Sequence, residues 1–354
     1  MRHALPFGAA LAALLLITPA AAASTSDPLS DRQWGLDQIR AERAWETSTG
    51  AGVVIAVVDT GVDLTHPDLR TKLVAGATFV GCGKRPAPCG DGDWKGVDGV
   101  GQPSDVHGTH VAGIAAARTN NRTGVAGVAP DAKVMPVKVL EDGTGSFDDI
   151  AKGIRWSVDH GAEIINLSLG ALPGVQALVL TGVLSDVQEA ISYASDRGVA
   201  IVAAAGNEAA PLCDTPSFDR GALCVAATDR NELKAWYSNL AFKLDNKVVA
   251  APGGAGLRNC NDNVWSTVPQ GTGSDSCGQA DYDAFAGTSM AAPHVAGVAA
   301  LLYAQGRDLA DVENALLTTA RNPLLLGLRG VPTLLYGRGI VDAEAAVAAP
   351  RKIT

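Results

Sequence analysis

The sequence predicts an α/β fold of three layers, in which helices cover both faces of a central, mostly parallel sheet. Short apolar runs recur along the chain, and segments of helical length lie between them. A strand buried on both faces is apolar at every position, so runs without polar alternation are typical of parallel sheets. No linker, repeat or low-complexity tract follows the N-terminal segment, which favours one large domain.

Five apolar runs are expected to form this sheet, and five segments between and after them are expected to form helices. The strands are predicted at 53–58, 134–140, 164–169, 199–204 and 223–227. The helices are predicted at 107–117, 147–160, 185–197, 289–303 and 309–319. Because parallel strands end at one edge of the sheet, polar residues that directly follow them are expected to gather in one crevice.

Composition and charge exclude two broad classes of protein. With 47% hydrophobic and 18% charged residues, the chain is too apolar to be a disordered, highly charged protein. The formal net charge is −9 and no basic run occurs. Binding to nucleic acid through phosphate contacts needs clustered Lys and Arg, so no nucleic-acid partner is expected.

The N-terminal segment reads as a secretory signal peptide cut after Ala23. Residues 1–3 are weakly basic, residues 4–17 are almost all apolar, and three alanines at 21–23 precede the expected cleavage site. An uncleaved anchor is the alternative, but the apolar stretch is shorter than the ~20 residues that span a bilayer. The mature domain is then expected at 24–354, outside the cell, monomeric and without a membrane segment.

Six cysteines lie in the mature part of the chain, and sequence alone allows 15 pairings. The simplest prediction pairs sequence neighbours, because each pair closes a short loop: Cys82–Cys89, Cys213–Cys224 and Cys260–Cys277. Free thiols or a metal cluster are the alternatives. The chain has no C-x-x-C pair, which disfavours a zinc site of that type, and an even number in an exported chain favours disulfides.

Four polar residues follow strands or open helices, and each alone has an ordinary structural explanation. Asp59 can be a strand-end carboxylate, His107 and Ser289 can cap helices, and Asn207 follows glycine as in many turns. Together, however, they supply the roles needed for acyl transfer. Ser289 is a nucleophile beside the exposed N–H groups of a helix start, where Pro293 is expected in the first turn. His107 is its base, Asp59 orients the imidazole, and Asn207 donates to an oxyanion.

The order Asp59, His107, Asn207, Ser289 and the strings around them resemble the subtilisin-like serine proteases, the subtilase or peptidase S8 family. These strings are VDTGV at 58–62, HGTHVAG at 107–113, AAGN at 204–207 and GTSMA at 287–291. The likeness extends over about 27–347 and is greatest to the thermitase-like branch. It implies a secreted serine endopeptidase that forms an acyl-enzyme with Asp59, His107 and Ser289.

The resemblance also implies how an extended polypeptide substrate binds. Ser168, Leu169 and Gly170 would pair with the substrate backbone as an added strand. Ala203, Ala204, Ala205 and Gly206 would form the facing wall of the S1 pocket, which receives the substrate side chain preceding the cut bond. Asp214, just before Thr215 and Pro216, would lie near the pocket floor and favour Lys or Arg; the alternative is that it faces solvent.

Relatives of this kind often hold a structural calcium ion near the N-terminal segment. The matching positions offer side-chain oxygens of Asp27, Asp68 and Asn121, and carbonyls of Arg118, Thr123 and Val125. Hard oxygen ligands of this mixture suit Ca²⁺. A solvated turn without an ion is the alternative. The segment 79–106 departs from the family and reads as a solvated acidic loop, with a second Ca²⁺ there as the alternative. Only residues 24–32 precede the part that resembles the mature domain, so no folded prodomain is expected.

Three other functions compete with this interpretation. The Asp59-Thr60-Gly61 string also occurs in aspartic proteases, but their second copy of it is missing. A zinc hydrolase using His107 and His110 lacks a third ligand in the sequence. An exported binding protein with the same fold and no activity is the remaining alternative, because a fold does not ensure a function.

Overall fold

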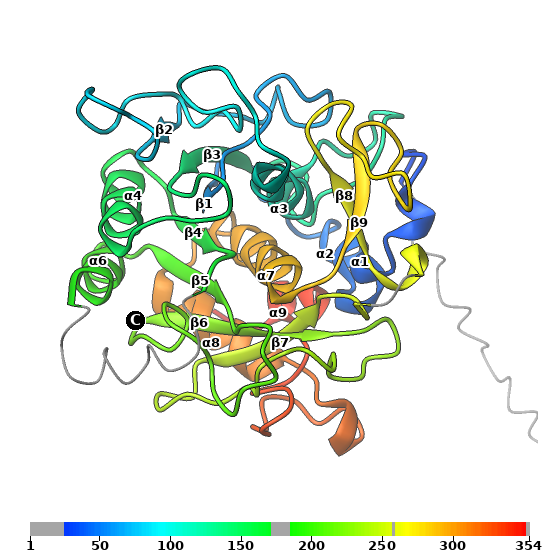
Figure 1. The fold of residues 1–354 in the computed structure, drawn as a ribbon. Coiled ribbons are helices and arrows are strands. Elements are labelled where there is room, and N and C mark those ends of the chain that lie inside the picture. The colour runs from blue at the N-terminus through cyan, green and yellow to red at the C-terminus, as the bar shows by residue number, and fades with distance from the viewer. Residues whose placement is uncertain (1–24, 171–184, 257–258, 352–354) are drawn as a thin grey trace, which may run out of the picture.

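A seven-stranded parallel sheet forms the middle layer of the protein, with the strand order β2-β3-β1-β4-β5-β6-β7. The computed structural model describes residues 25–170, 185–256 and 259–351 (Figure 1). The strands are β1 (Val54–Asp59), β2 (Ala77–Thr78), β3 (Lys133–Lys138), β4 (Ile164–Leu167), β5 (Ala200–Ala204), β6 (Ala222–Thr228) and β7 (Val248–Pro252). A separate antiparallel pair is formed by β8 (Val264–Thr267) and β9 (Tyr282–Phe285).

Helices cover both faces of the sheet. One face packs on α4 (Phe147–Asp159) and α6 (Ser185–Ser195), and the other on α3 (His107–Ala116) and α7 (Thr288–Tyr303) (Figure 1). The remaining helices are α1 (Trp34–Ile39), α2 (Ala41–Ala44), α8 (Leu309–Thr319) and α9 (Ala343–Ala348), with 3-10 turns at Ser30–Arg32, Pro103–Val106, Cys260–Asp262 and Pro323–Leu325. None of the described helices combines the length and the apolar character that a membrane crossing requires.

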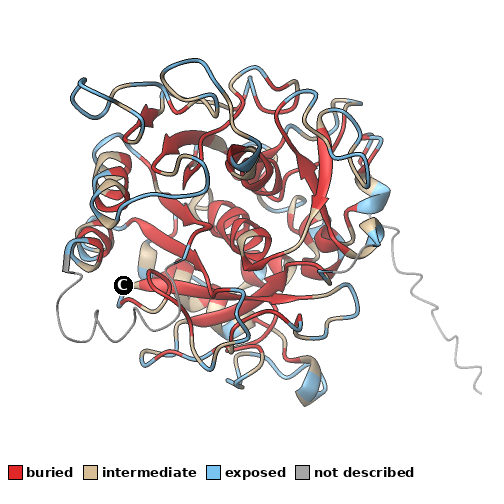
Figure 2. Cartoon of the chain, viewed as in Figure 1, coloured by how far each residue is buried: buried red, intermediate tan, exposed pale blue. Residues whose placement is uncertain are grey.

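The strands are buried along almost their whole length, which explains their mostly apolar sequences (Figure 2). In β1, Ile55 and Val57 enter the core on the α7 side, whereas Ala56 and Val58 enter the core on the α4 side. Alternate residues therefore fill two separate cores, as expected for a sheet covered on both faces. The predicted fold class is confirmed.

Each predicted strand and helix is present, with ends displaced by at most two residues. Two differences bear on function. The strand predicted at 164–169 ends at Leu167, so 168–170 continues beyond the paired part of β4. Pro293 is the sixth residue of α7 rather than part of its first turn, because the helix already begins at Thr288. Strands β2, β7, β8 and β9 were not predicted.

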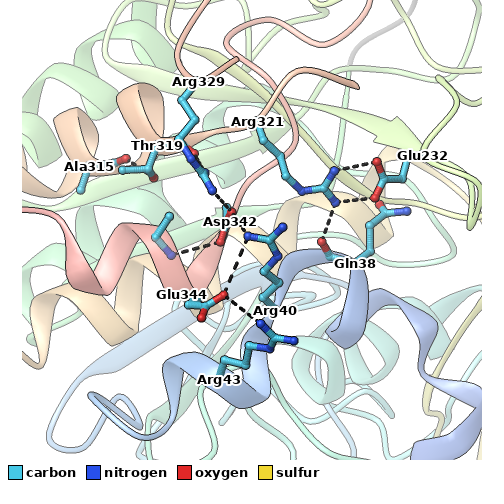
Figure 3. Close-up of polar contacts among 11 residues, drawn as sticks. Gln38, Arg40, Arg43, Glu232, Ala315, Thr319, Arg321, Arg329, Asp342 and Glu344 are labelled. Atoms are coloured by element: carbon cyan, nitrogen blue, oxygen red, sulfur yellow. Dashed lines mark hydrogen bonds and ion pairs between the residues drawn. The ribbon is translucent and has the colours of Figure 1, made fainter. Parts of the chain in front are cut away.

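A cluster of ion pairs joins the C-terminal part of the chain to α2 and to a loop after β6 (Figure 3). Asp342 Oδ2 accepts from Arg40 at 2.9 Å and from Arg329 at 2.7 Å, while its Oδ1 accepts from the Ala345 N–H at the start of α9. Arg321 makes two hydrogen bonds to Glu232, at 2.5 and 2.6 Å. The cluster therefore ties segments that lie far apart in the sequence.

Three disulfides join neighbouring cysteines, as the sequence predicts: Cys82–Cys89, Cys213–Cys224 and Cys260–Cys277. The partners are 7, 11 and 17 residues apart. Each bridge therefore closes a short loop.

Candidate active site

A cleft of about 730 Å³ opens where the carboxyl ends of β1, β3, β4 and β5 meet. Residues that directly follow these strands line it, together with the starts of α3 and α7. The predicted residues in its lining are His107, Ser168, Leu169, Gly170, Ala204, Gly206, Asn207, Asp214 and Ser289. The expected gathering of polar residues at one edge of the sheet is thus observed.

His107 lines this cleft and is hydrogen-bonded to Asp59, which does not line it. Asp59 ends β1 and is fully buried, and its Oδ1 accepts from His107 Nδ1 at 2.7 Å. The same oxygen accepts from the Thr60 N–H at 2.7 Å, which fixes the carboxylate. The His107 side chain is 28% exposed, so the imidazole is held at Nδ1 while its other edge faces the cleft.

The pKa of His107 is raised above its ordinary value through competing influences. Burial is the largest of them and favours the neutral ring, but the charge of Asp59 and its hydrogen bond favour the protonated ring more strongly in sum. An imidazole of raised pKa is a stronger base for a proton taken from a neighbouring hydroxyl.

Ser289 is the second residue of α7, and it is tied to the segment after β4. Its hydroxyl donates to the Ser168 carbonyl at 3.2 Å, and the Ser168 hydroxyl donates to the Ser289 carbonyl at 2.7 Å. In a regular helix the carbonyl of Ser289 would accept from residue 293, but Pro293 has no N–H. The proline therefore leaves that carbonyl available to Ser168.

The side chain of Asn207 is oriented by Thr288. Its Oδ1 accepts from the Thr288 N–H at 2.9 Å and from the Thr288 hydroxyl at 3.0 Å. With the oxygen occupied in this way, the amide NH₂ is left to act as a donor beside Ser289. Gly206, which precedes it, has φ of +104°, and a side chain there would collide with Asp214 and Asn239.

Two of the four residues expected in the S1 wall line the cleft, and Ala203 instead lies in the core on the α4 side. Ala204 and Gly206 line the cleft, whereas Ala205 is fully buried in a separate apolar cluster with the Cys213–Cys224 disulfide. Successive residues of an extended segment point to opposite sides, so Ala205 cannot share the orientation of its neighbours.

Asp214 does not face solvent. It is 1% exposed, lines the cleft, and its carboxylate lies near Gly206 and Gly170. The next two residues, Thr215 and Pro216, also line the cleft.

The six residues considered for calcium belong to one network of hydrogen bonds. Buried Asp27 accepts from the N–H groups of Asn120 and Asn121 at 2.7 and 2.9 Å. Buried Asp68 accepts from Asn121 Nδ2 at 2.7 Å, the Tyr282 hydroxyl at 3.0 Å and the Val125 N–H at 3.2 Å. The Arg118 N–H donates to the Asp68 carbonyl and the Thr123 N–H to Asn121 Oδ1.

These residues fit a hard cation. Within the described ranges, no cationic side chain forms a hydrogen bond or ion pair with either carboxylate, and burial raises the pKa of Asp68 above its ordinary value. Two buried carboxylates held by neutral donors, with an amide and loop carbonyls nearby, form an oxygen set of the kind that calcium takes.

The sequence analysis did not identify one part of the cleft lining. This part of the lining comes from the segment after β3 and the start of α4. Its residues are Leu140, 143–145, Phe147 and Ile150. The position of this segment directly after an apolar strand is the signal that could have identified it.

The chain matches the model of the subtilase family over residues 50–339. It is 41% identical to thermitase of Thermoactinomyces vulgaris over 324 residues, covering 91% of this chain and 98% of that one. It is 39% identical to subtilisin BL of Lederbergia lenta, covering 88% of this chain and 97% of that one.

A solved structure titled as proteases from Pseudoalteromonas arctica PAMC 21717 is similar in fold and sequence. It superposes with a TM-score of 0.73 and 35% identity, covering 92% of this chain and 99% of that one. These relatives are named as proteases and align with most of this chain. They therefore do not favour the alternatives of an exported binding protein without activity or of an aspartic protease.

Proposed function

The chain belongs to the subtilase family and is a subtilisin-like serine endopeptidase, and from this premise we propose that Asp59, His107 and Ser289 are its catalytic triad. The observation that carries the assignment is the 2.7 Å hydrogen bond between Asp59 and His107, which lines the cleft that also contains Ser289. Asn207 is proposed as the oxyanion donor.

The proposed reaction proceeds in two halves. Ser289 Oγ attacks the carbonyl carbon of the substrate peptide while His107 Nε2 takes the hydroxyl proton. The carbon–nitrogen bond then breaks, and His107 returns the proton to the departing amine, which leaves an acyl-enzyme. A water molecule attacks the ester in the same way, with His107 as base, and releases the acid and Ser289. Asp59 stabilises the imidazolium that forms in each half.

The negative charge on the attacked oxygen is stabilised by two kinds of donor. One is the side-chain NH₂ of Asn207, whose orientation is set by Thr288. The other is the backbone N–H of Ser289 at the start of α7, whereas the neighbouring Thr288 and Met290 N–H groups already donate to Asn207 Oδ1 and to the Gly287 carbonyl. Fixed donors aimed at developing charge need no reorganisation during the reaction, which is why they accelerate it.

The substrate is proposed to bind as an extended chain between two walls. Ser168, Leu169 and Gly170 lie beyond the paired end of β4, so their backbone can add a substrate strand. Ala204 and Gly206 form the wall opposite. Asp214 lies buried in the cleft between these walls, and a carboxylate there favours a Lys or Arg side chain before the cut bond.

This preference is tested with chromogenic tetrapeptides that differ only in Phe, Leu, Lys or Arg before the cut bond. A higher kcat/KM for Lys and Arg, lost in Asp214→Asn, supports the assignment. Preference for Phe or Leu contradicts it without affecting the triad.

Structural calcium is proposed at the network of Asp27, Asp68 and Asn121, with carbonyls of Arg118, Thr123 and Val125. When bound, the ion supplies positive charge to two buried carboxylates and takes no part in the chemistry. These residues hold the N-terminal segment against the loop 118–125, because Asp27 already binds the N–H groups of that loop.

Export is proposed from the sequence of residues 1–23, which lie outside the described residues. Positive charge, an apolar run and three alanines form the signal, and residues 24–354 form the catalytic domain. The curated relatives include a protein named extracellular protease from Xanthomonas campestris.

A serine-directed fluorophosphonate tests the assignment of the nucleophile. It is expected to label the wild-type protein at Ser289 and to block hydrolysis of a denatured polypeptide. Ser289→Ala is expected to lose both, and His107→Ala to lose nearly all labelling while the fold persists. Normal hydrolysis by Ser289→Ala would overturn the proposal.

A further inference from the structure

A buried ion pair lies next to Asp59 and His107. Lys138 ends β3 and stands in register with Asp59 of β1. Its side chain is 0% exposed and that of Asp105 is 1% exposed. Lys138 Nζ donates to Asp105 Oδ2 at 2.8 Å, to the Thr60 carbonyl at 2.8 Å and to the Trp94 carbonyl at 3.3 Å. All three N–H groups of the ammonium are therefore used.

Two of these partners lie close in the sequence to Asp59 and His107. Thr60 follows Asp59, and its N–H donates to Asp59 Oδ1 at 2.7 Å. Asp105 stands two residues before His107, on the 3-10 turn that leads into α3. The Thr60 hydroxyl donates to the Asp105 carbonyl at 2.9 Å and accepts from the Gly108 N–H at 2.9 Å. A connected set of hydrogen bonds thus runs from Asp59 through Thr60 to the first turn of α3.

We propose that Lys138 and Asp105 are positioning residues, whose ion pair holds the turn at Thr60 against the start of α3 and so sets the Asp59–His107 hydrogen bond. The inference rests on the triad proposed above. Neither residue touches the substrate or the reacting atoms in this proposal; both act through Thr60 and the turn before His107.

Stability alone is a poor explanation for this pair. Burying two charges removes both from water, and a well-packed apolar pair of similar volume often stabilises a fold equally well. An apolar pair lacks directional hydrogen bonds, however, and those are what fix one turn relative to another. Within the described ranges Lys138 is the one hydrogen-bond donor to the Asp105 carboxylate, so loss of Lys138 would leave that buried carboxylate without a donor.

The double variant Lys138→Met/Asp105→Leu separates positioning from stability. It removes both charges together, so no unpaired charge is left in the core and the fold is expected to persist. If the pair positions the dyad, kcat falls roughly 10- to 100-fold while KM stays within about twofold, because misplaced catalytic groups slow the chemical step rather than binding. Lys72→Met is the matched control: Lys72 is a buried lysine that donates to the Pro130 carbonyl, away from the cleft.

Proton NMR gives a second readout that does not need turnover. The His107 Nδ1 proton, held in a short bond to Asp59, is expected to resonate far downfield in the wild type and in Lys72→Met. In the double variant this resonance is expected to move upfield or broaden. Because it is measured without substrate, it tests positioning even if the proposed proteolysis fails.

A folded double variant with wild-type kcat and an unchanged downfield proton overturns the proposal. If the double variant does not fold, Asp105→Asn carries the test, since the amide keeps the shape and a hydrogen-bond acceptor but loses the charge. A several-fold loss of kcat at constant KM, with a shifted proton, is expected there. An unchanged kcat together with an unshifted proton resonance in Asp105→Asn overturns the proposal as well.

Discussion

Ser168 and Ser289 exchange two hydrogen bonds, each hydroxyl donating to the backbone carbonyl of the other residue. The exchange joins the segment expected to bind substrate to the residue expected to attack it. It depends on Pro293, which leaves the Ser289 carbonyl without its helical partner. Asn166 extends the link, because its side-chain NH₂ donates to the Ser168 hydroxyl at 2.9 Å.

Ser168→Ala is expected to lower kcat modestly and to leave the fold intact. One hydrogen bond to the Ser289 carbonyl is lost, and such a bond contributes about 1 kcal/mol net, or roughly fivefold in rate. Steady-state kinetics on a peptide substrate measure the effect. A rise in KM with constant kcat would show instead that Ser168 acts in substrate binding alone.

Asn207→Leu is expected to lower kcat by roughly 10²–10³ with little change in KM, a magnitude known for oxyanion donors in this family rather than derived from this structure. The loss arises because the donor acts on charge that develops in the transition state. Asn207→Asp is the matched control, because its carboxylate can still accept from the Thr288 N–H and hydroxyl but has no N–H to donate to the oxyanion. Near-normal kcat in the leucine variant contradicts the assignment.

Asp59→Asn is expected to move the acidic limb of the kcat/KM profile to lower pH. The Asp59 charge and hydrogen bond raise the pKa of His107, and their loss leaves burial, which lowers it. Activity needs the neutral imidazole, so it rises with pH through this pKa in both proteins, from a lower starting pH in the variant. The maximal kcat falls by about 10⁴ as the imidazole loses its orientation. An unmoved limb would show that another group controls it.

Removal of calcium is expected to lower the melting temperature. A ligand at about 100 times its Kd stabilises the folded state by about 2.7 kcal/mol, and EDTA removes that contribution. Differential scanning calorimetry with EDTA, and then with added Ca²⁺, measures it. The melting temperature of Asp68→Asn should be low both with EDTA and with added Ca²⁺. Asp91→Asn, in the exposed acidic loop, should respond to EDTA and Ca²⁺ as the wild type does. A wild-type melting temperature indifferent to EDTA excludes the ion.

Two substitutions of Asp342 should separate its charge from its role at the start of α9. Asp342→Asn keeps an oxygen for the Ala345 N–H but loses the attraction to Arg40 and Arg329. Asp342→Ala loses both and is expected to be less stable by about a further 1 kcal/mol in urea unfolding. Because both arginines are more than a third exposed, the charge effect should shrink at high salt. Equal free energies of unfolding for Asp342→Asn and Asp342→Ala would show that the hydrogen bond to the Ala345 N–H contributes nothing.

The sequence was most informative where residues are buried on every side. The cores on the two sides of β1 require continuous apolar runs, and those runs predicted five strands within two residues of their ends. Strands β8 and β9 escaped prediction because each has only four residues and includes polar ones. Strand β7 is as long and as apolar as β5, and its run at 248–252 was not recognised. Neighbouring cysteines were paired correctly because each pair lies within one short loop.

Side-chain direction was the part that sequence could not supply. Ala205 was expected in the cleft with its neighbours, yet it lies in the core, because direction reverses from one residue to the next. Lys138 was read only as part of a strand, and nothing local in the sequence indicates that it reaches Asp105 and Thr60. Such contacts depend on the register between β1 and β3, which the chain fixes only when it folds.

Helix α7 brings the proposed nucleophile to the cleft and also fills the middle of the molecule, with 14 of its 16 residues buried (Figure 2). During synthesis, Asp59 and His107 emerge long before this helix does. A nascent chain that ends before α7 lacks both a large part of its interior and the proposed nucleophile, Ser289. Because the proposed nucleophile lies on this helix, the candidate active site cannot be complete before the core is.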